Sequence, residues 1–349
     1  MNTDFTTGIS VLSHGALGDG VHDDTEAFQN ALLAAEKTGE RVVVPAGRYA
    51  VRELHIPAHV SLCGLASYTC DTEGGSVLLA CDPNAVCLID LTNAKGAVIC
   101  GLTLRGEEMG ECVHGIFAEY DKKEETTDYF HIEDVKCTGF SGDGIHLVNV
   151  NKAAIHHCMF HNNHCGVHFD GCDLQFIDNR ACYNRNDGFS SGEITLSHLI
   201  GCRFDHNQTN GVNITAARGL QLHANSYEAN TLCGLSLCAQ PEKISEGISI
   251  TGSAFSDNAA PNQPDEPNHD TQTDLPAPHG QMEIRYVNSL SVMANTCSVS
   301  DPALFAEFGF WIAHADHATV TSNAMHQAAK HAAWYDDFRT DGKTEYNIE

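Results

Sequence analysis

Five times between residues 160 and 258, an aromatic residue is followed three positions later by asparagine. The pairs are Phe160 and Asn163, Tyr183 and Asn186, Phe204 and Asn207, Tyr227 and Asn230, and Phe255 and Asn258. The first four pairs recur every 21 to 23 residues, a period typical of one structural unit stacked on copies of itself. We therefore expect a solenoid with an asparagine ladder at a tight turn, where asparagine tolerates left-handed backbone.

A short glycine-led run follows four of these pairs and also occurs in an earlier coil. The runs are Gly144-Ile-His-Leu, Gly166-Val-His-Phe, Gly188-Phe-Ser-Ser, Gly211-Val-Asn-Ile and Gly234-Leu-Ser-Leu. Because side chains alternate along a strand, the residue after each glycine is predicted to point inward and the next one outward. The predicted outward column is Phe117, His146, His168, Ser190, Asn213, Ser236 and, near its far end, Trp311. The residues before the glycines form a second column: Asp143, Cys165, Asp187, Asn210, Cys233 and His279.

Composition restricts the partners and the compartment. The formal net charge of −27 disfavours nucleic acid and anionic membranes as partners. The N-terminus MNTDFTTGIS lacks the basic and apolar regions of a signal peptide, and no apolar run is long enough to span a membrane. The 15 cysteines include no CxxC pair, so Cys137, Cys158, Cys182 and Cys202 are interpreted as small inward side chains in a reducing compartment. The sequence thus predicts a cytoplasmic protein.

The N-terminal segment has a different pattern. Residues 8 to 20 are expected to be extended, and the helical spacing of Phe28, Ala31, Leu32 and Ala35 predicts a helix. Asp24 or Thr25 is suited to its N-cap and Gly39 to its end. We predict one domain over 1–349, with an N-terminal segment and helix in 1–40, coils in 41–333 and a tail or cap in 334–349. Residues 106–130 and 259–280 interrupt the coils, and the second of these loops is expected to border a substrate cleft.

The segment GALGDGVHDDTEAFQNALLAAEKTGERVVVPAGRYAV, residues 15 to 51, resembles the opening of the pectate-lyase-3 type of parallel β-helix proteins. Both the GDG-x-x-DDT pattern and the later V-x-x-P-x-G-x-Y pattern are matched. The resemblance implies an all-β fold, a single-stranded right-handed parallel β-helix with an N-terminal capping α-helix. Proteins of this type include polysaccharide lyases, glycoside hydrolases, uronate epimerases, fructan-converting enzymes and phage tailspikes, so the resemblance implies a carbohydrate-related function only as a class.

Carboxylates near the predicted sheet face are candidates for glycosidic chemistry. Asp143 and Asp187 are predicted two coils apart, about 9.5 Å, the upper end of the separation of about 6.5–9.5 Å in inverting glycosidases. Asp170 and Glu193 are expected near the same face, where one acid of the group could stay protonated. The alternative for each Asp-Gly is a simple turn.

Histidines are the second kind of candidate. His146 and His168 should lie one coil apart, where they could act as a general base or bind a metal ion. Alternation sends the five histidines of residues 156–170 to several faces, so we expect no metal site. The predicted catalytic residues are therefore Asp143, Asp170, Asp187, His146 and His168. The predicted substrate-binding residues are Glu193, Asn213, Ser190, Glu283, Arg285 and Trp311; Arg285 could instead form a structural ion pair.

Three functions remain open at this point. The preferred one is a hydrolase acting on an oligo- or polysaccharide without a cofactor. The second is a uronate lyase with a histidine base, for which Ca²⁺ would be a possible cofactor. The third is a non-catalytic carbohydrate-binding or spike-like protein. A homotrimer is possible in each case, because flat solenoid faces can associate.

Overall fold

The computed structural model describes residues 7–121, 128–259, 280–300, 306–325 and 329–338. Most of the predicted cleft-bordering loop 259–280, together with His279, lies outside these residues. Contacts between Cα atoms divide the chain into two compact units, residues 1–175 and 176–349, and the boundary falls within strand β15. The prediction of a single domain is not tested by this division.

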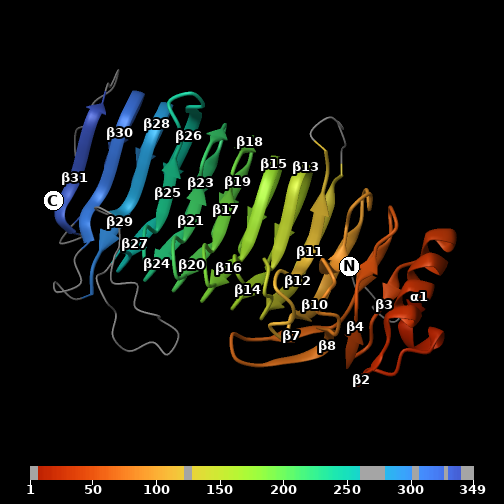
Figure 1. The fold of residues 1–349 in the computed structure, drawn as a ribbon. Coiled ribbons are helices and arrows are strands. Elements are labelled where there is room, and N and C mark those ends of the chain that lie inside the picture. The colour runs from red at the N-terminus through yellow and green to blue at the C-terminus, as the bar shows by residue number, and fades with distance from the viewer. Residues whose placement is uncertain (1–6, 122–127, 260–279, 301–305, 326–328, 339–349) are drawn as a thin grey trace. The chain divides into compact units, whose positions relative to one another are not determined.

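The first unit combines one α-helix with short strands (Figure 1). Its helical elements are the 3₁₀ helix η1 (Val11–His14) and α1 (Thr25–Thr38). Its strands are β1 (Ile9–Ser10), β2 (Asp19–Asp23), β3 (Val42–Val43), β4 (Gly47–Val51), β5 (Leu54–His55), β6 (Ser61–Cys63), β7 (Ala66–Tyr68), β8 (Glu73–Ala80), β9 (Cys87–Asp90), β10 (Val98–Arg105), β11 (His114–Glu119), β12 (Phe130–Thr138), β13 (Ile145–His156), β14 (Met159–His161) and β15 (Val167–Ile177).

The second unit consists of strands in its described residues. They are β16 (Arg180–Cys182), β17 (Phe189–Ser191), β18 (Ile194–Thr195), β19 (His198–Ile200), β20 (Arg203–Asp205), β21 (Val212–Ile214), β22 (Ala217–Arg218), β23 (Gln221–His223), β24 (Ser226–Glu228), β25 (Leu235–Cys238), β26 (Ser245–Thr251), β27 (Ala254–Ser256), β28 (Gly280–Met293), β29 (Thr296–Ser298), β30 (Ala306–Thr321) and β31 (Ala329–Phe338). Strand β31 occupies the start of the predicted tail 334–349, and residues beyond 338 lie outside the described chain.

Within each unit the strands pair in parallel along separate ladders. The first unit has β3–β6–β10–β12–β13, β4–β8–β10–β12–β14 and β5–β9–β11–β13. The second has β16–β20–β24–β27–β29, β17–β21–β25–β28–β30–β31 and β19–β23–β26–β28. Strands that pair only with the previous and next coil define a parallel β-helix, so the predicted fold class is confirmed.

The N-terminal helix forms where the sequence predicts it. Helix α1 starts after Asp24 and ends before Gly39, whose φ of 73° closes the helix in the left-handed conformation. Phe28, Ala31, Leu32 and Ala35 are buried on its inner face. Asp24 occupies the N-cap position, but its side chain makes no hydrogen bond to the first turn of the helix. Its carboxylate instead accepts hydrogen bonds from the backbone N–H groups of Leu17 (2.7 Å) and Gly18 (3.1 Å). No described helix has the length and apolarity needed to cross a bilayer.

The asparagine ladder exists, with one correction to its membership. In the second unit it runs through Asn184, Asn207, Asn230, Asn258 and Gln281, and each of the four asparagine side chains donates to the side-chain oxygen of the next member at 2.7–2.9 Å. Asn186 was wrongly placed in it. Ala181, not Tyr183, pairs with Phe204, so the aromatic-plus-three pattern marks the wrong register in this coil.

The left-handed backbone lies one residue earlier than predicted. The residues before the ladder asparagines carry the positive φ angles: Tyr183 (55°), His206 (56°), Ala229 (52°) and Asp257 (54°). The ladder asparagines are therefore selected for their buried amides, which pair along the stack, and not for backbone tolerance.

The predicted cysteine ladder is buried. Cys137, Cys158, Cys182 and Cys202 are at most 3 % exposed, and none of the four is in a disulfide. They contribute small apolar side chains to the core, as predicted.

Candidate functional site

The predicted outward column is confirmed in the first unit by strand register. Along β5–β9–β11–β13 the column is His55, Asp90, Phe117 and His146. The neighbours of His146 in its strand, Ile145 and Leu147, are fully buried, which sends the imidazole to the outer face. The His146 ring stacks between Phe117 (centroids 5.5 Å apart) and His168 (4.9 Å). Two imidazoles and one aromatic ring therefore share this surface.

Asp143 lies at the centre of the cluster and is 6 % exposed. Its carboxylate faces Nδ1 of His146 at 2.8 Å and Nδ1 of His164 at 3.2 Å, and it accepts the backbone N–H of Cys165 at 3.1 Å. Burial alone would raise the pKa of this carboxyl, but the hydrogen bonds from His146 and His164 outweigh burial and hold the pKa well below its usual range. Asp143 is therefore a permanent anion that orients histidines.

His114 belongs to the same cluster, although it was not among the predicted residues. Its Nδ1 accepts the backbone N–H of Asp143 at 2.9 Å. A nitrogen that accepts a hydrogen bond carries no proton, so this imidazole is neutral with its proton on Nε2, which lies 3.5 Å from the Cys112 sulfur. Burial lowers the pKa of His114 to about 4, against the opposing charge of Asp143. We therefore treat the 3.6 Å approach of His114 to the Asp143 carboxylate as a contact without ion pairing.

The burial of neutral His114 predicts a pH-dependent stability. In the unfolded chain its pKa returns to about 6.5, so between pH 6.5 and 4 unfolding takes up a proton and stability falls as the pH falls. The expected loss is at most about 1.4 kcal/mol per pH unit, or about 3 kcal/mol over this window.

The measurement is the free energy of unfolding of wild type and His114→Asn at pH 7.0, 5.5 and 4.5. Asparagine keeps an acceptor for the Asp143 N–H but does not titrate. The variant should therefore show the shallower pH dependence, and equal slopes for the two proteins would contradict the assignment.

A second imidazole–carboxylate pair lies beside the first. Nε2 of His168 is 3.5 Å from the Asp170 carboxylate, two residues further along β15. We call His146 with Asp143 and His168 with Asp170 the paired imidazoles. Among the described residues, Nε2 of His146 has no hydrogen-bond partner, and the side chain is 21 % exposed. This nitrogen is thus available to a ligand on the outer face.

In the second unit the outward column also follows the register. Along β17–β21–β25–β28–β30 it is Ser190, Asn213, Ser236, Glu283 and Trp311. Asp187 lies behind this column, buried, and accepts hydrogen bonds from the side chains of Thr209, Asn210 and Asn213. Its carboxylate is occupied by internal donors, as the turn interpretation of Asp-Gly expects.

The remaining predicted binding residues contact one another or other charges. Arg285 forms an ion pair with Glu283 and lies 4.2 Å from the centre of the Trp311 ring. Glu193 forms an ion pair with Lys243. These four charged side chains are thus engaged within the protein, and the face of Trp311 is covered by a guanidinium group.

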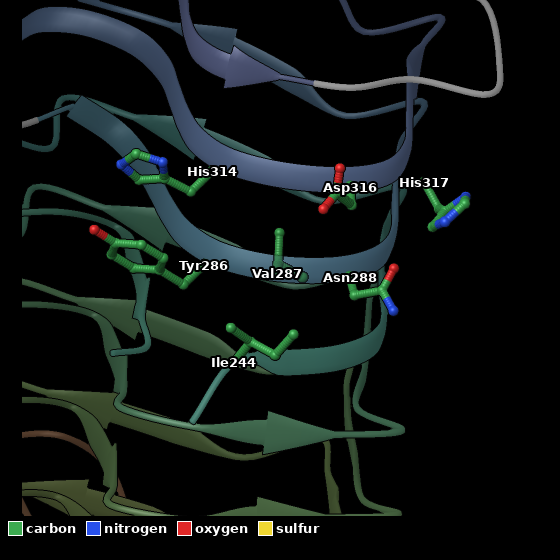
Figure 2. Close-up of a pocket in the computed structure, with 7 residues that line it drawn as sticks. All are labelled: Ile244, Tyr286, Val287, Asn288, His314, Asp316 and His317. Carbon is green, nitrogen blue, oxygen red and sulfur yellow. The ribbon is translucent and has the colours of Figure 1, made fainter. Parts of the chain in front are cut away.

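A separate hollow of about 330 Å³ lies on another part of the second unit. Figure 2 shows Tyr286 and His314 together on one side of it, Asn288 and Asp316 on the other, and Ile244 and Val287 between them. The Tyr286 and His314 rings stack at 4.4 Å. None of the predicted site residues lines this hollow.

Comparison with known proteins gives two matches to family models. Residues 85–273 match the model described as periplasmic copper-binding protein (NosD). Residues 8–74 match the model described as rhamnogalacturonase A/epimerase, pectate lyase-like. Among curated proteins, the plasmin and fibronectin-binding protein A of Streptococcus pneumoniae is 46 % identical over 50 residues, which is 14 % of this chain and 7 % of that protein. The chain therefore matches only a small part of this relative's length.

Solved structures resemble most of the chain. The A-module of the mannuronan C-5 epimerase AlgE6 from Azotobacter vinelandii aligns with a TM-score of 0.60 at 18 % identity, covering 96 % of this chain and 99 % of that module. The bacteriophage phi29 gene product 12 aligns with a TM-score of 0.70 at 14 % identity, covering 94 % of this chain and 50 % of that one. The Streptococcus pneumoniae adhesin PfbA aligns with a TM-score of 0.62 at 11 % identity, covering 98 % of each chain. At these identities the likeness concerns the fold, a parallel β-helix of the pectate-lyase-like kind.

Proposed function

We propose that this chain, which belongs to the family described as periplasmic copper-binding protein NosD because that model matches more than half of it, acts on a saccharide. The proposed chemistry is proton transfer at His146 on the outer face of the β-helix. The observation that carries the proposal is the arrangement of the paired imidazoles. Asp143 holds Nδ1 of His146 at 2.8 Å, which leaves Nε2 directed to a ligand. A carboxylate that fixes the tautomer of an accessible imidazole is the usual arrangement for a general base.

The copper implied by the family description does not fit this histidine cluster. His114 uses Nδ1 to accept the Asp143 N–H, so its Nε2 is protonated and cannot bind a metal. Nδ1 of His146 and Nδ1 of His164 both face Asp143. Asp143 itself already accepts three hydrogen bonds. A metal ion bound by Asp143 together with these imidazoles would have to break the hydrogen bonds that Asp143 makes, and we derive no step through copper.

The geometry favours proton abstraction over hydrolysis. A hydrolase needs one carboxyl group that stays protonated, but the pKa of Asp143 lies far below its usual range, and Asp187 is surrounded by donors. Imidazoles that accept or donate a proton near neutral pH suit removal of the proton next to a uronate carboxylate. The epimerase in the matched family model and the mannuronan epimerase in the structural comparison support this class of substrate.

In the proposed step His146 Nε2 takes the proton from the carbon that bears the uronate carboxylate. The electron pair moves into that carboxylate, where the positive charge of His168, when protonated, would stabilise it. In elimination these electrons expel the neighbouring glycosidic oxygen, which takes a proton from solvent. In epimerisation the carbon takes a proton from solvent on the opposite face. In both cases His146 then returns its proton to solvent. Phe117, stacked on His146 at 5.5 Å, offers an apolar surface to a sugar ring.

The test is to incubate the protein with uronate and neutral oligosaccharides, with and without EDTA. Elimination is followed by absorbance of the unsaturated product, epimerisation by exchange of the abstracted proton with deuterated water, and hydrolysis by new reducing ends. Turnover of a uronate by either of the first two is expected. Release of reducing ends from a neutral sugar, lost in Asp143→Asn and Asp187→Asn, would instead support the hydrolase. The EDTA arm tests the calcium ion that a lyase could use.

A second candidate function is non-catalytic saccharide binding. The likeness to the PfbA adhesin and to the phage protein favours it, as does the occupation of Asp187, Glu283 and Arg285 by internal partners. It predicts saccharide binding without turnover, and binding that survives His146→Gln.

A further inference from the structure

The hollow shown in Figure 2 is lined by residues that the proposed saccharide chemistry does not use. Strand register places Asn288 of β28 between Glu246 of β26 and Asp316 of β30. Val287 and Ala315, one residue earlier in their strands, are buried, so alternation directs this column to the outer face. Asn288 and Asp316 both line the hollow, which therefore opens on the column.

Asn288 presents an unsatisfied hydrogen-bond acceptor at this hollow. Its Oδ1 atom is buried, and no donor in the described part of the chain reaches it. Figure 2 shows this oxygen turned toward the coil that carries Asp316. The neighbours in the column, Glu246 and Asp316, accept hydrogen bonds but cannot donate them when ionised, and Glu246 pairs with Arg218 at 3.7 Å. Because a buried acceptor without a donor is unfavourable, a ligand that brings N–H or O–H groups would be stabilised here.

The rest of the hollow is apolar and aromatic. Ile244 is 52 % exposed, although its side chain is aliphatic, and it lies beside Val287 in the hollow. The stacked rings of Tyr286 and His314 form the side opposite Asp316 (Figure 2). An alkyl chain can pack on such a surface while its polar end reaches the acceptors. The hollow thus offers an apolar wall next to acceptors that lack a donor.

Charge distinguishes among the ligands that carry donors. The side chains that line the hollow in the described chain include one carboxylate, Asp316, and no lysine or arginine, so a uronate would be repelled. A neutral hydroxyl forms weaker hydrogen bonds than a charged donor does. The net charge of −27 also raises the local concentration of cations. A cation with N–H groups is therefore favoured over both kinds of sugar.

The coil spacing is compatible with one nitrogen shared by two acceptors. Asn288 and Asp316 belong to paired strands, which lie about 4.8 Å apart. Two N⁺–H···O bonds of about 2.8 Å can bridge up to about 5.6 Å through a single nitrogen. An ammonium group can therefore donate to both side chains at once, and Asp316 can accept this bond besides others because a carboxylate has about four acceptor sites.

We propose that this hollow binds a free primary alkylammonium ion, with its nitrogen between Asn288 and Asp316 and its methylene groups on Ile244. The volume of about 330 Å³ lies at the lower end of the range of about 300–1,000 Å³ for ligand sites, which suits a small amine. The inference does not rest on the proposed function, because none of the paired imidazoles lines the hollow.

The experiment titrates the full-length protein with n-butylammonium at pH 8 and follows binding by ligand-observed NMR. Two further probes separate charge from hydrogen bonding. 1-Butanol has the alkyl chain without the charge, and tetramethylammonium has the charge without an N–H group. We expect n-butylammonium to bind at least about 10-fold more tightly than either probe, and added salt to weaken its binding.

Three variants test the assigned residues. Asp316→Asn should weaken binding of n-butylammonium by about 10- to 100-fold, because it removes the charge. Asn288→Leu should weaken it by about 2- to 10-fold without lowering the free energy of unfolding, because it also removes an unsatisfied buried oxygen. Glu242→Gln is the matched control. It removes an exposed carboxylate near Ile244 but outside the hollow and should bind as wild type does. Circular dichroism confirms that each variant is folded.

Four results would overturn the proposal. Equal affinity for n-butylammonium and tetramethylammonium, or equal weakening in Asp316→Asn and Glu242→Gln, would indicate general attraction of counterions to an acidic surface. Binding of glucose that is lost in Asn288→Leu would make the hollow a saccharide site. Tighter binding of Nα-acetyl-lysine methylamide than of n-butylammonium would assign the hollow to a lysine side chain of another protein.

Discussion

Replacing His146 with glutamine is expected to reduce turnover of a uronate substrate by about 10²–10⁴-fold. Glutamine retains an N–H that can donate to Asp143, so the buried carboxylate keeps a partner and the fold should persist. What is lost is Nε2, the one imidazole nitrogen of this residue without a partner among the described residues. The Michaelis constant should change little, since the substitution removes a proton acceptor and leaves Phe117 in place.

The matched control is His131→Gln. His131 lies on β12, on a different ladder, and its side chain is 41 % exposed, so its replacement should leave turnover unchanged. Turnover within threefold of wild type in His146→Gln would remove this residue from the reaction. Loss of activity in both variants would indicate a structural effect instead.

Asp143→Asn separates orientation from proton transfer. The asparagine side chain has one acceptor oxygen, so it cannot accept hydrogen bonds from both His146 and His164. It also lacks the negative charge that favours protonation of a neighbouring imidazole. The pH at which activity rises should therefore shift in this variant, whereas a residue with a purely structural role would lower activity at every pH by the same factor. The pH–rate profiles of Asp143→Asn and wild type are the measurement.

The sequence predicted the outward columns because the glycine-led runs fix strand register locally. His146, Ser190, Asn213 and Trp311 all occupy the column positions that alternation assigns to them. His114 could have been found by the same rule. His114-Gly115-Ile116-Phe117 repeats the pattern of Asp143-Gly144-Ile145-His146 one coil earlier, so the column before the glycines begins one coil sooner than we predicted.

What a column position cannot show is which partner a side chain has. The pattern does not reveal that Asp143 collects His146 and His164, or that Glu283 and Arg285 pair with each other. It also fails where two registers satisfy the same rule. Both Ala181-x-x-Asn184 and Tyr183-x-x-Asn186 place asparagine after an apolar or aromatic residue, and only the backbone pairing of Ala181 with Phe204 distinguishes them.

Replacement of a ladder asparagine is expected to lower the free energy of unfolding more than any other substitution considered above. Asn230 is 1 % exposed. Its oxygen accepts the backbone N–H of Asn207 (3.1 Å) and the Asn207 amide (2.9 Å), and its own amide donates to Phe204 O (3.0 Å) and Asn258 Oδ1 (2.7 Å). Asn230→Ala leaves donors and acceptors of two neighbouring coils without this partner, and each such buried group costs about 1–3 kcal/mol. We expect a loss of at least about 4 kcal/mol in the free energy of unfolding.

Asn186→Ala is the matched control. Asn186 belongs to the pattern in the sequence but not to the ladder, and its half-buried side chain accepts a hydrogen bond from Thr209 at 2.9 Å. Because Asn186 lies outside the stack of buried amides, its replacement should cost about 1 kcal/mol. Denaturant unfolding of both variants, followed by circular dichroism, measures the difference, and the transition midpoint replaces the free energy if unfolding of the stacked coils is not two-state. Equal losses in the two variants would mean that the ladder amides contribute no more than an ordinary surface asparagine. A smaller loss for Asn230→Ala than for Asn186→Ala would contradict the stabilising role of the ladder.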